Sequence, residues 1–399
     1  MRLGDPTGTA GGIETPTVDP GVLERGLVSS VELGLIDPGV AQRARIVARL
    51  AGEGVVSGQV LATWLGVSRA AVHKHVDVLR LRGLQIDSTS GAGYRLGHLP
   101  WDLLVPEAVL PLLLGSIGGG FPVTFDVLPL GLPYTFVAEI ESTNRHLREI
   151  GLGFPTGAVV VTDHQTQGRG RLGRRWVTEP GLDLTFSVLL RPHVAPLAAP
   201  QLVLAASAAV ADAIAALPGM AERVTIKWPN DVLIDGRKVC GILSEGSLDM
   251  DTVHWLILGI GVNVNSRPAA ALAAAQVAES TAAPAALGET FGVTVPRAPL
   301  LAGILARLGA RLEQVEAGAF AEVLSTLAER DALRGKEVVV RSGYRGADVV
   351  AEGIASGLAP DGELLVRLGD GRVTAVAVGE VTLAAPGDEP APEVETGAI

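Results

Sequence analysis

The apolar positions of residues 41–99 follow first the spacing of short helices and then that of a hairpin. Val72, Val76 and Leu79 stand at i, i+4 and i+7, so they share one face of a helix that Ser68 can cap. Two helical stretches precede this helix, and two short apolar segments separated by a glycine-containing turn follow it. The pattern predicts a winged helix-turn-helix.

Residues 100–334 show a different pattern, in which strand-like and helical stretches alternate. Apolar residues recur at every second position of residues 182–190, whereas residues 202–217 are rich in alanine and residues 301–315 carry an amphipathic helical stripe. Alternating strands and helices are typical of a domain built around a sheet. We expect an α/β domain with a mixed sheet.

Residues 335–385 are predicted to form only strands. Asp361-Gly362 and Asp370-Gly371 are signals for hairpin turns between short apolar segments, and we expect a small SH3-like β-barrel. Residues 1–40 are predicted to be a flexible leader, and residues 386–399 a disordered tail rich in proline and glutamate. The predicted fold class is therefore α+β and multidomain, with a winged helix-turn-helix, a mixed-sheet α/β domain and a C-terminal barrel.

The distribution of charge separates the first domain from the rest of the chain. The 399 residues carry a formal net charge of -11, which argues against a chain that binds nucleic acid over its whole surface. Residues 41–99, in contrast, contain seven Arg and one Lys against three acidic residues, a net of +5. The single cysteine, Cys240, excludes an intrachain disulfide and lies in the middle of a predicted core strand. We expect a cytoplasmic protein without a membrane span, because neither a signal-peptide pattern nor a long uninterrupted apolar stretch is present.

The first candidate for chemistry is the segment GRGRLGRRW at residues 168–176. Its glycines permit unusual backbone angles and close approach to a ligand, and its arginines offer fixed charge and forked donors suited to phosphate. The segment matches neither a Walker A loop nor a GxGxxG fingerprint followed by a long helix. A solvated basic loop or a nucleic-acid patch is the alternative interpretation.

Two further segments carry candidate residues. In KWPND, Pro229 ends a strand, and the predicted hairpin that follows turns at residues 235–236, which would bring Lys227 and Lys238 to one site. A structural hairpin with an exposed lysine is the alternative. The segment ESTN at residues 141–144 can be read alone as ordinary helix capping.

Taken together, these segments are more specific than any one of them. Their order and spacing resemble the biotin protein ligase family, on GRGRLGRRW at 168–176, KWPND at 227–231, ESTN at 141–144 and GIGVNVN at 259–265. The N-terminal domain is similar to that of the bifunctional ligases that double as biotin-operon repressors, on SRAAVHKH at 68–75 and GAGY at 91–94. The resemblance covers about residues 41–385.

The resemblance implies an activity and a set of site residues. Such an enzyme joins biotin to ATP, with Mg²⁺, to form biotinyl-5′-AMP, and then transfers biotin to a lysine on the biotin carboxyl carrier domain of a carboxylase. The implied biotin contacts are Ser142, Thr143, Asn144, Gln165, Arg169, Gly170, Arg171 and Lys238. The implied ATP or adenylate contacts are Arg169, Arg171, Arg174, Trp176, Lys227, Asn230 and Asn263. The implied catalytic residues are Arg171, Lys227, Asp231 and Lys238, and no resident metal site is expected.

The chemistry of that reaction is consistent with these residue types. Attack of a carboxylate on a phosphate brings two anions together, so cations must offset the repulsion and the charge that develops. The resulting mixed anhydride must be kept from water, which a glycine-rich loop that orders over the ligand would do. Asp231 is the candidate for orienting or deprotonating the carrier lysine, but it could instead hold a metal ion or brace Lys227.

The basic domain predicts a contact with DNA. Opposite the apolar stripe of the helix that Ser68 caps, six residues are expected to face DNA: Ser68, Arg69, Ala70, His73, Lys74 and Arg80. A solvated helix in a protein-interaction module is the alternative, and the acidic Asp77 on that face argues mildly for it. Useful specificity would need two copies on a two-fold site, and the resemblance implies a homodimer when the ligand is bound, on operator DNA.

Three other functions remain open at this point. A lipoate-type ligase shares the expected fold, although the arginine-rich segment and KWPND argue against it. A biotin-sensing or nucleotide-sensing repressor without catalysis is a second possibility, which the intact Arg171, Lys227 and Lys238 disfavour. The third is a ligase whose DNA-binding module is not functional.

Overall fold

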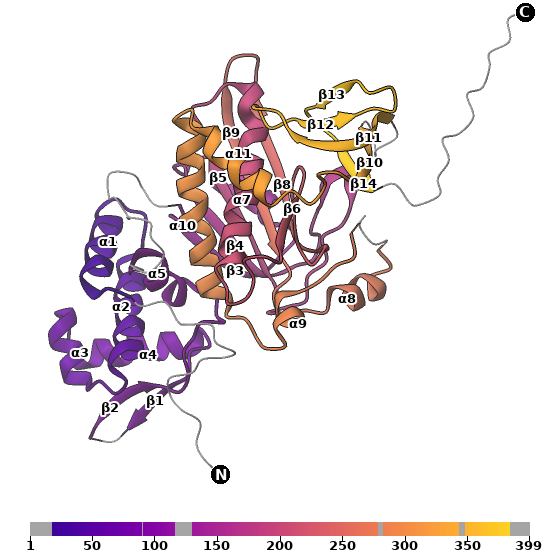
Figure 1. The fold of residues 1–399 in the computed structure, drawn as a ribbon. Helices are drawn as coiled ribbons and strands as arrows, with labels where there is room; N and C mark the ends of the chain where they lie inside the picture. The colour runs from indigo at the N-terminus through magenta and orange to yellow at the C-terminus, as the bar shows by residue number, and fades with distance from the viewer. Residues whose placement is uncertain (1–17, 90, 116–129, 278–281, 343–347, 384–399) are drawn as a thin grey trace, which may run out of the picture.

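The computed structural model describes residues 18–89, 91–115, 130–277, 282–342 and 348–383. It contains a two-stranded sheet in an N-terminal helical module, a central seven-stranded sheet and a five-stranded C-terminal sheet. In Figure 1 the module (indigo) and the C-terminal sheet (yellow) lie at opposite ends of the central domain. Residues 1–17 of the expected flexible leader and the expected disordered tail at 386–399 lie outside the described residues.

The module has the helices and the hairpin that the apolar pattern predicts. Helix α3 and helix α4 begin at serine caps, because the Ser57 and Ser68 hydroxyls accept hydrogen bonds from Val60 N and Ala71 N. Gly66 adopts a left-handed conformation at the turn between the two helices. The elements are α1 (Pro20–Glu32), α2 (Pro38–Glu53), α3 (Gly58–Leu65), α4 (Arg69–Leu81), β1 (Ile86–Thr89) and β2 (Gly93–Leu96).

The expectation of a flexible leader is wrong for residues 20–32, which form helix α1. Asp19 caps this helix by accepting a hydrogen bond from Val22 N, and Pro20 occupies the first turn, where a missing N–H costs nothing. Leu23 and Leu27 are buried against the following helices. Burial of these two leucines supplies the order that the glycine- and proline-rich composition does not suggest.

Helix α5 (Pro106–Gly115) connects the module to the central domain. Its Glu107 is fully buried and accepts a hydrogen bond from Arg43 Nε of α2 at 2.7 Å, while Arg82 Nε at the end of α4 lies 3.8 Å away. A buried carboxylate needs such partners to offset its lost hydration. Glu107 therefore fixes the position of both helices relative to the connector.

The central sheet is mixed, as the sequence predicts. Its strand order is β3-β4-β5-β9-β8-β7-β6, with β3 parallel to β4 and every other neighbouring pair antiparallel. The strands are β3 (Tyr134–Ile140), β4 (Val159–Gln165), β5 (Leu184–Leu190), β6 (Val224–Lys227), β7 (Asp231–Ile234), β8 (Arg237–Leu248) and β9 (Val253–Val262).

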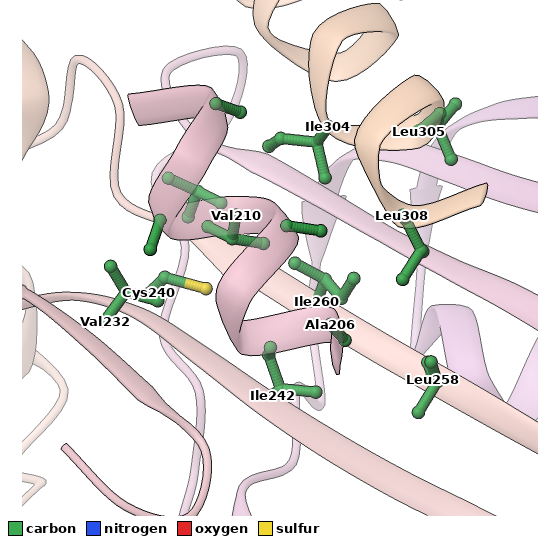
Figure 2. Packing of buried hydrophobic residues seen from close by; sticks show 14 of the residues in the cluster. Ala206, Val210, Val232, Cys240, Ile242, Leu258, Ile260, Ile304, Leu305 and Leu308 are labelled. Atoms are coloured by element: carbon green, nitrogen blue, oxygen red, sulfur yellow. The ribbon is translucent and has the colours of Figure 1, made fainter. Parts of the chain in front are cut away.

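Helices cover both faces of this sheet. The main core lies between the sheet and helices α7 (Ala199–Ala215) and α10 (Arg297–Glu316), with α11 (Phe320–Glu329) beside them. Figure 2 shows Ala206 and Val210 of α7 packed over Ile242 and Ile260 of the sheet. The opposite face carries α6 (Thr143–Gly151), and two short helices, α8 (Pro268–Ala274) and α9 (Leu287–Phe291), follow β9.

Cys240 lies in this core, as expected from its place in the sequence. Its side chain is fully buried beside Val232 and faces α7 in Figure 2. Burial raises the pKa of the Cys240 thiol well above its ordinary value, which makes the thiol unreactive.

One helix among the described residues, Pro196–Ala215, is long and apolar enough to cross a membrane by length and composition. In its most apolar 18-residue window, 61% of the window is buried inside the protein. A central core helix has the same composition as a membrane span, so this helix is weak evidence for a span.

The C-terminal sheet is antiparallel, with strand order β13-β12-β11-β10-β14. Its strands are β10 (Glu337–Ser342), β11 (Asp348–Leu358), β12 (Leu364–Arg367), β13 (Val373–Val376) and β14 (Glu380–Leu383). The predicted turn at Gly362 inserts between helices of the central domain, where a Cβ would lie 2.5 Å from Leu204 Cδ1. Gly362 O also accepts a hydrogen bond from Trp228 Nε1 at 3.0 Å, so the turn docks this sheet onto the central domain.

Two buried charged residues tie the loops at one end of the central sheet. Arg297, 3% exposed, donates to Asp163 Oδ1, to Asp183 O and to Asp102 of the connector. Asp183, 2% exposed, accepts hydrogen bonds from Val264 N and from a neighbouring backbone amide. Burial raises the pKa of Asp183 to about 6, against the opposing effect of these hydrogen bonds.

The raised pKa of Asp183 predicts how its contribution to stability changes with pH. Because the folded-state pKa lies above the unfolded value, ionisation costs free energy of folding, and this cost grows as pH rises towards 6. We expect Asp183→Asn to gain about 1 kcal/mol of stability relative to the wild type between about pH 5 and about pH 7. Urea denaturation over that range measures this difference.

The control variant is Asp251→Asn, which changes an exposed aspartate in the turn between β8 and β9. Its stability difference from the wild type should stay constant over the same range. A constant difference for Asp183→Asn as well would mean that Asp183 is not destabilised by ionisation.

Candidate active site

One cavity at the end of the central sheet collects the residues that the sequence singles out for chemistry. Every residue expected to contact biotin or ATP, or to act in catalysis, lines it: Ser142, Thr143, Asn144, Gln165, Arg169, Gly170, Arg171, Arg174, Trp176, Lys227, Asn230, Asp231, Lys238 and Asn263. These residues come from segments that are up to 121 positions apart in the chain, between 142 and 263. The structure brings all of these residues to one cavity. The separate role of each residue remains a prediction.

The polar floor of the cavity lies at the beginning of α6. Ser142 stands at the cap position, yet its side chain makes no capping hydrogen bond, so the capping interpretation of ESTN does not describe this helix. Gln165, at the end of β4, accepts a hydrogen bond from Thr143 N at 2.8 Å, with Thr143 Oγ1 at 3.1 Å. Thr143 and Asn144 are 2% and 4% exposed, so both are held in place before any ligand binds.

The arginine- and glycine-rich segment forms a loop across the cavity. Its two ends pair through a bridge between Arg169 and Arg175, and the segment between them makes one short turn, η1 (Arg171–Gly173). Trp176 then packs against the sheet, where a Cβ on Gly261 would lie 2.4 Å from its ring. The Trp176 indole N–H is shielded from solvent and has no hydrogen-bond partner among the described residues.

Three cationic side chains enter the cavity from the hairpins and the loop. Lys227 is 6% exposed, and burial lowers its pKa, with the nearby carboxylate of Asp231 acting in the opposite direction. Lys238 Nζ lies 2.6 Å from Asp231 Oδ1, as the predicted hairpin requires. Burial also lowers the pKa of Arg171, whose Nη1 donates to Asn230 Oδ1 at 2.9 Å. The alternative of a hairpin with an exposed lysine therefore does not hold.

The C-terminal sheet completes this cavity, which the sequence did not reveal. Arg171 Nη2 donates to Gly379 O at 3.0 Å, and Arg174 forms an ion pair with Glu380. Glu380 and Val381, at the start of β14, line the cavity. No local signal marks these residues, because their role depends on how two distant domains dock.

Asn263 lies at the other wall, directly after β9. Its side chain donates to Ala285 O at 3.0 Å, and its backbone N–H donates to Val239 O at 2.8 Å. The asparagine is 5% exposed and links the strand end to the segment before α9. The next residue, Val264, is the one whose backbone amide Asp183 holds.

Five of the six residues expected to contact DNA are exposed. They are Ser68, Arg69, Ala70, His73 and Lys74, and His73 Nδ1 lies 2.8 Å from Asp77 Oδ2. The exposed face leaves the DNA and the protein-interaction interpretations both open.

Ser68 and Arg80 differ from that expectation. The hydroxyl of Ser68 is engaged in capping, and Arg80 turns towards the wing. Arg80 donates to Ile86 O at 3.0 Å and to Ser88 Oγ at 2.7 Å, so it braces the hairpin instead of pointing away from the module. A helical projection gives the face of a residue but not the partner that a long side chain reaches.

Comparison with known proteins identifies each part of the chain. Residues 42–95 match a family model described as HTH domain, residues 136–263 match the Biotin/lipoate A/B protein ligase family, and residues 334–383 match the Biotin protein ligase C terminal domain. Among solved structures, the biotin protein ligase from Aquifex aeolicus in complex with biotin and ATP is similar, with a TM-score of 0.51 and 30% identity. The similarity covers 63% of this chain and 99% of that chain.

Curated relatives extend the likeness over most of the chain. The biotin--[acetyl-CoA-carboxylase] ligase of Paracoccus denitrificans is 35% identical over 59% of this chain and 95% of its own length. The chain spans 62% and 63% of the length of two Bacillus relatives named bifunctional ligase/repressor BirA. The protein of that name from Escherichia coli is 30% identical over 85% of this chain and 96% of its own length. On this match, with the three family models in the same order, the chain belongs to the biotin protein ligase family, in the form that carries an N-terminal helix-turn-helix domain.

Proposed function

We propose that this protein is an ATP-dependent biotin protein ligase and also a biotin-dependent transcriptional repressor. It forms biotinyl-5′-AMP from biotin and ATP and transfers biotin to a lysine of a biotin carboxyl carrier domain of a carboxylase. The observation that carries the proposal is the cavity itself, in which a rigid polar floor at Thr143 and Asn144 faces Arg171, Lys227 and Lys238. A ligand with a polar group at one end and an anionic, reacting group at the other fits a cavity that is polar on its floor and cationic on the facing side.

The cations support the first half-reaction. A carboxylate oxygen of biotin attacks the α-phosphorus of ATP, an O–P bond forms, and pyrophosphate leaves with the bonding pair. Lys238 and Arg171 are placed to offset the repulsion between the two anions and the charge that grows on the phosphate oxygens. Because burial has already removed much of their hydration, little reorganisation is needed when that charge develops.

Magnesium is expected to accompany ATP instead of occupying a resident site. Among the described residues no group of three His, Cys, Asp or Glu side chains lies close enough to hold a metal ion. Asp231 and Glu380 are the acidic residues in the lining of the cavity, and Mg²⁺ commonly takes one or two carboxylates together with phosphate oxygens and water. Either carboxylate could contribute one ligand, and the ion would neutralise phosphate charge.

The loop at 168–176 supports protection of the adenylate. A mixed anhydride survives only where water is excluded, and Trp176 already covers Gly261 in the sheet below. Arg171 and Arg174 bond to the C-terminal sheet, so that sheet helps to hold the loop over the reacting atoms.

In the second half-reaction the carrier lysine attacks the acyl carbon, and AMP leaves. The attacking amine must lose a proton, and Asp231 is the candidate acceptor at the end of the cavity. Its pairing with Lys238 suggests an order of events, because Lys238 can turn to the substrate carboxylate or phosphate and so free the Asp231 carboxylate.

A lipoate-type ligase is the closest alternative, because its family model is shared over residues 136–263. The decisive experiment measures exchange of labelled pyrophosphate into ATP with biotin and, separately, with lipoate. We expect exchange with biotin. Exchange with lipoate alone would overturn the proposed substrate.

Removal of the positive charge of Lys238 is expected to slow the first half-reaction. Lys238→Met keeps a similar bulk but removes the charge, and we expect biotin-dependent pyrophosphate exchange to fall by a factor of about 100 to 1,000. The matched control is Lys336→Met, at an exposed lysine of the loop before β10, which should keep the wild-type rate. Full exchange by Lys238→Met would remove this residue from the chemistry.

Asp231→Asn separates the two half-reactions. We expect transfer of biotin from preformed adenylate to a carrier domain to slow by a factor of about 100, while pyrophosphate exchange falls less. Single-turnover transfer measured by mass spectrometry gives the first rate. Equal losses in both steps would instead assign Asp231 to holding Lys238 or the magnesium ion.

We further propose that the module binds operator DNA as a homodimer formed when the adenylate is bound, which rests on the exposed Arg69, His73 and Lys74 of α4. A ligase with a module that no longer binds DNA is the alternative.

The remaining expectations, a cytoplasmic location and closure of the C-terminal sheet into an SH3-like barrel, are part of the same proposal. The register shifts in the pairing of β10 and β11 with their neighbours support the curvature that a barrel needs.

Sheared genomic DNA mixed with the protein, with and without biotin and MgATP, tests the repressor. We expect a palindromic site to be enriched only when both ligands are present. Arg69→Ala together with Lys74→Ala should abolish that enrichment and lower the dependence of binding on salt by about one unit for each phosphate contact removed. Arg25→Ala, which removes an exposed charge from α1, should leave both unchanged.

A further inference from the structure

Behind the polar floor of the cavity, four side chains form a continuous chain of hydrogen bonds. Thr143 Oγ1 lies 2.7 Å from Ser187 Oγ, and Ser187 Oγ lies 2.6 Å from Asn144 Oδ1. Asn144 Nδ2 lies 2.9 Å from Glu245 Oε2. Thr143 and Asn144 line the cavity, whereas Ser187 of β5 and Glu245 of β8 lie outside its lining. The last two residues therefore make no direct contact with a ligand in the cavity, and their hydrogen bonds reach it through the first two.

The asparagine in this chain is confined to two orientations. Asn144 packs against the backbone of Gly259, where a Cβ would lie 2.3 Å from Asn144 Oδ1. A side chain in such contact, 4% exposed, cannot swing away, but its amide can rotate by half a turn and exchange oxygen for nitrogen. In the alternative orientation Asn144 Oδ1 would face the Glu245 carboxylate, and two acceptors would repel each other.

Counting protons then sets the direction of every bond. An ionised carboxylate only accepts, so Glu245 holds the amino group of Asn144 towards itself. Asn144 Oδ1 must then accept from the one proton of Ser187, and Ser187 must accept from the one proton of Thr143. Gln165 Oε1 already accepts from Thr143 N at 2.8 Å, and its 3.1 Å contact with Thr143 Oγ1 is longer than the 2.7 Å contact of that hydroxyl with Ser187, so we assign the Thr143 proton to Ser187.

We propose that Glu245 is a positioning residue that determines ligand specificity, because its charge makes Thr143 present lone pairs, and no proton, to the cavity. A ligand N–H can then donate to Thr143 Oγ1, whereas a ligand acceptor at this point meets another acceptor. The proposal rests on the proposed function, since the ureido ring of biotin supplies such an N–H. Glu245 would thus select ligands that carry an N–H donor at this point, although it does not touch the ligand itself.

Reversal of charge at position 245 tests the proposal. Glu245→Lys offers a donor, so it should rotate Asn144, reverse the chain and make Ser187 donate to Thr143. We expect the dissociation constant for biotin, measured by calorimetry, to rise by about tenfold or more. The turnover number for pyrophosphate exchange at saturating biotin should change little. Glu245→Gln can accept or donate, so its effect should be smaller than that of Glu245→Lys.

The sign of this effect separates it from simple electrostatics. Biotin is an anion, so an added positive charge should strengthen binding if only the charge mattered. Glu149→Lys is the matched control, because it reverses an exposed charge on α6, the helix that carries Asn144. That control should bind biotin as the wild type does or slightly more tightly. Tighter or unchanged binding by Glu245→Lys would overturn the proposal.

A double-mutant cycle tests whether the effect travels through the chain. Ser187→Ala breaks the link between Asn144 and Thr143, so adding Glu245→Lys to it should cost much less affinity than in the wild type. Full additivity of the two substitutions would also overturn the proposal. A wild-type protein that binds no biotin would overturn the proposed function with it, whereas wild-type binding with an inert Glu245→Lys overturns only the role of Glu245.

Discussion

The cost of burying positive charge is the constraint on which the active site and the docking of the domains depend. Lys227, Lys238 and Arg171 lie in the cavity, and burial lowers the pKa of Lys227 and of Arg171, so these cations need partners that offset their lost hydration. Asp231 and Asn230, placed by the same hairpin, supply part of the compensation. The rest comes from another domain, through Gly379 O and Glu380. The C-terminal sheet is therefore needed to keep cations where the proposed chemistry requires them.

Polar groups behind the floor of the cavity are likewise paired, because Thr143, Ser187, Asn144 and Glu245 hydrogen-bond to one another. Glycines at 259 and 261 make room for Asn144 and Trp176 to lie directly on the backbone of β9. Rigidity at this point follows from close contact and from the fixed direction of hydrogen bonds, and it lets a ligand bind without first ordering its site.

Local patterns predicted the parts of the structure that local interactions decide. The hairpin turn after Ile234 lies within a few residues of Lys227 and Lys238, so their convergence could be inferred, and the helices of the module follow from spacing and serine caps. Apolar residues recur at every second position of β5, yet the residues between them are buried as well, and Ser187 among them belongs to the hydrogen-bonded chain behind the cavity. Glu245 and Glu380 could not be found, because their partners lie more than a hundred positions away in sequence. Helix α1 was not predicted, because proline usually interrupts a helix, whereas Pro20 lies in the first turn, where a helix tolerates it.

Helix α1 and the connector have a consequence for how this protein can be divided. The module has a small core of its own around Leu61 and Leu79, yet Leu23 and Leu27 belong to the same apolar cluster as the helices of the catalytic domain. Removal of the module would therefore expose apolar residues of the remaining protein to solvent, and Glu107 would lose its contacts with Arg43 and Arg82. The N-terminal module is therefore part of the folding unit of the central domain, and a separately expressed central domain would need apolar residues of this shared surface replaced by polar ones.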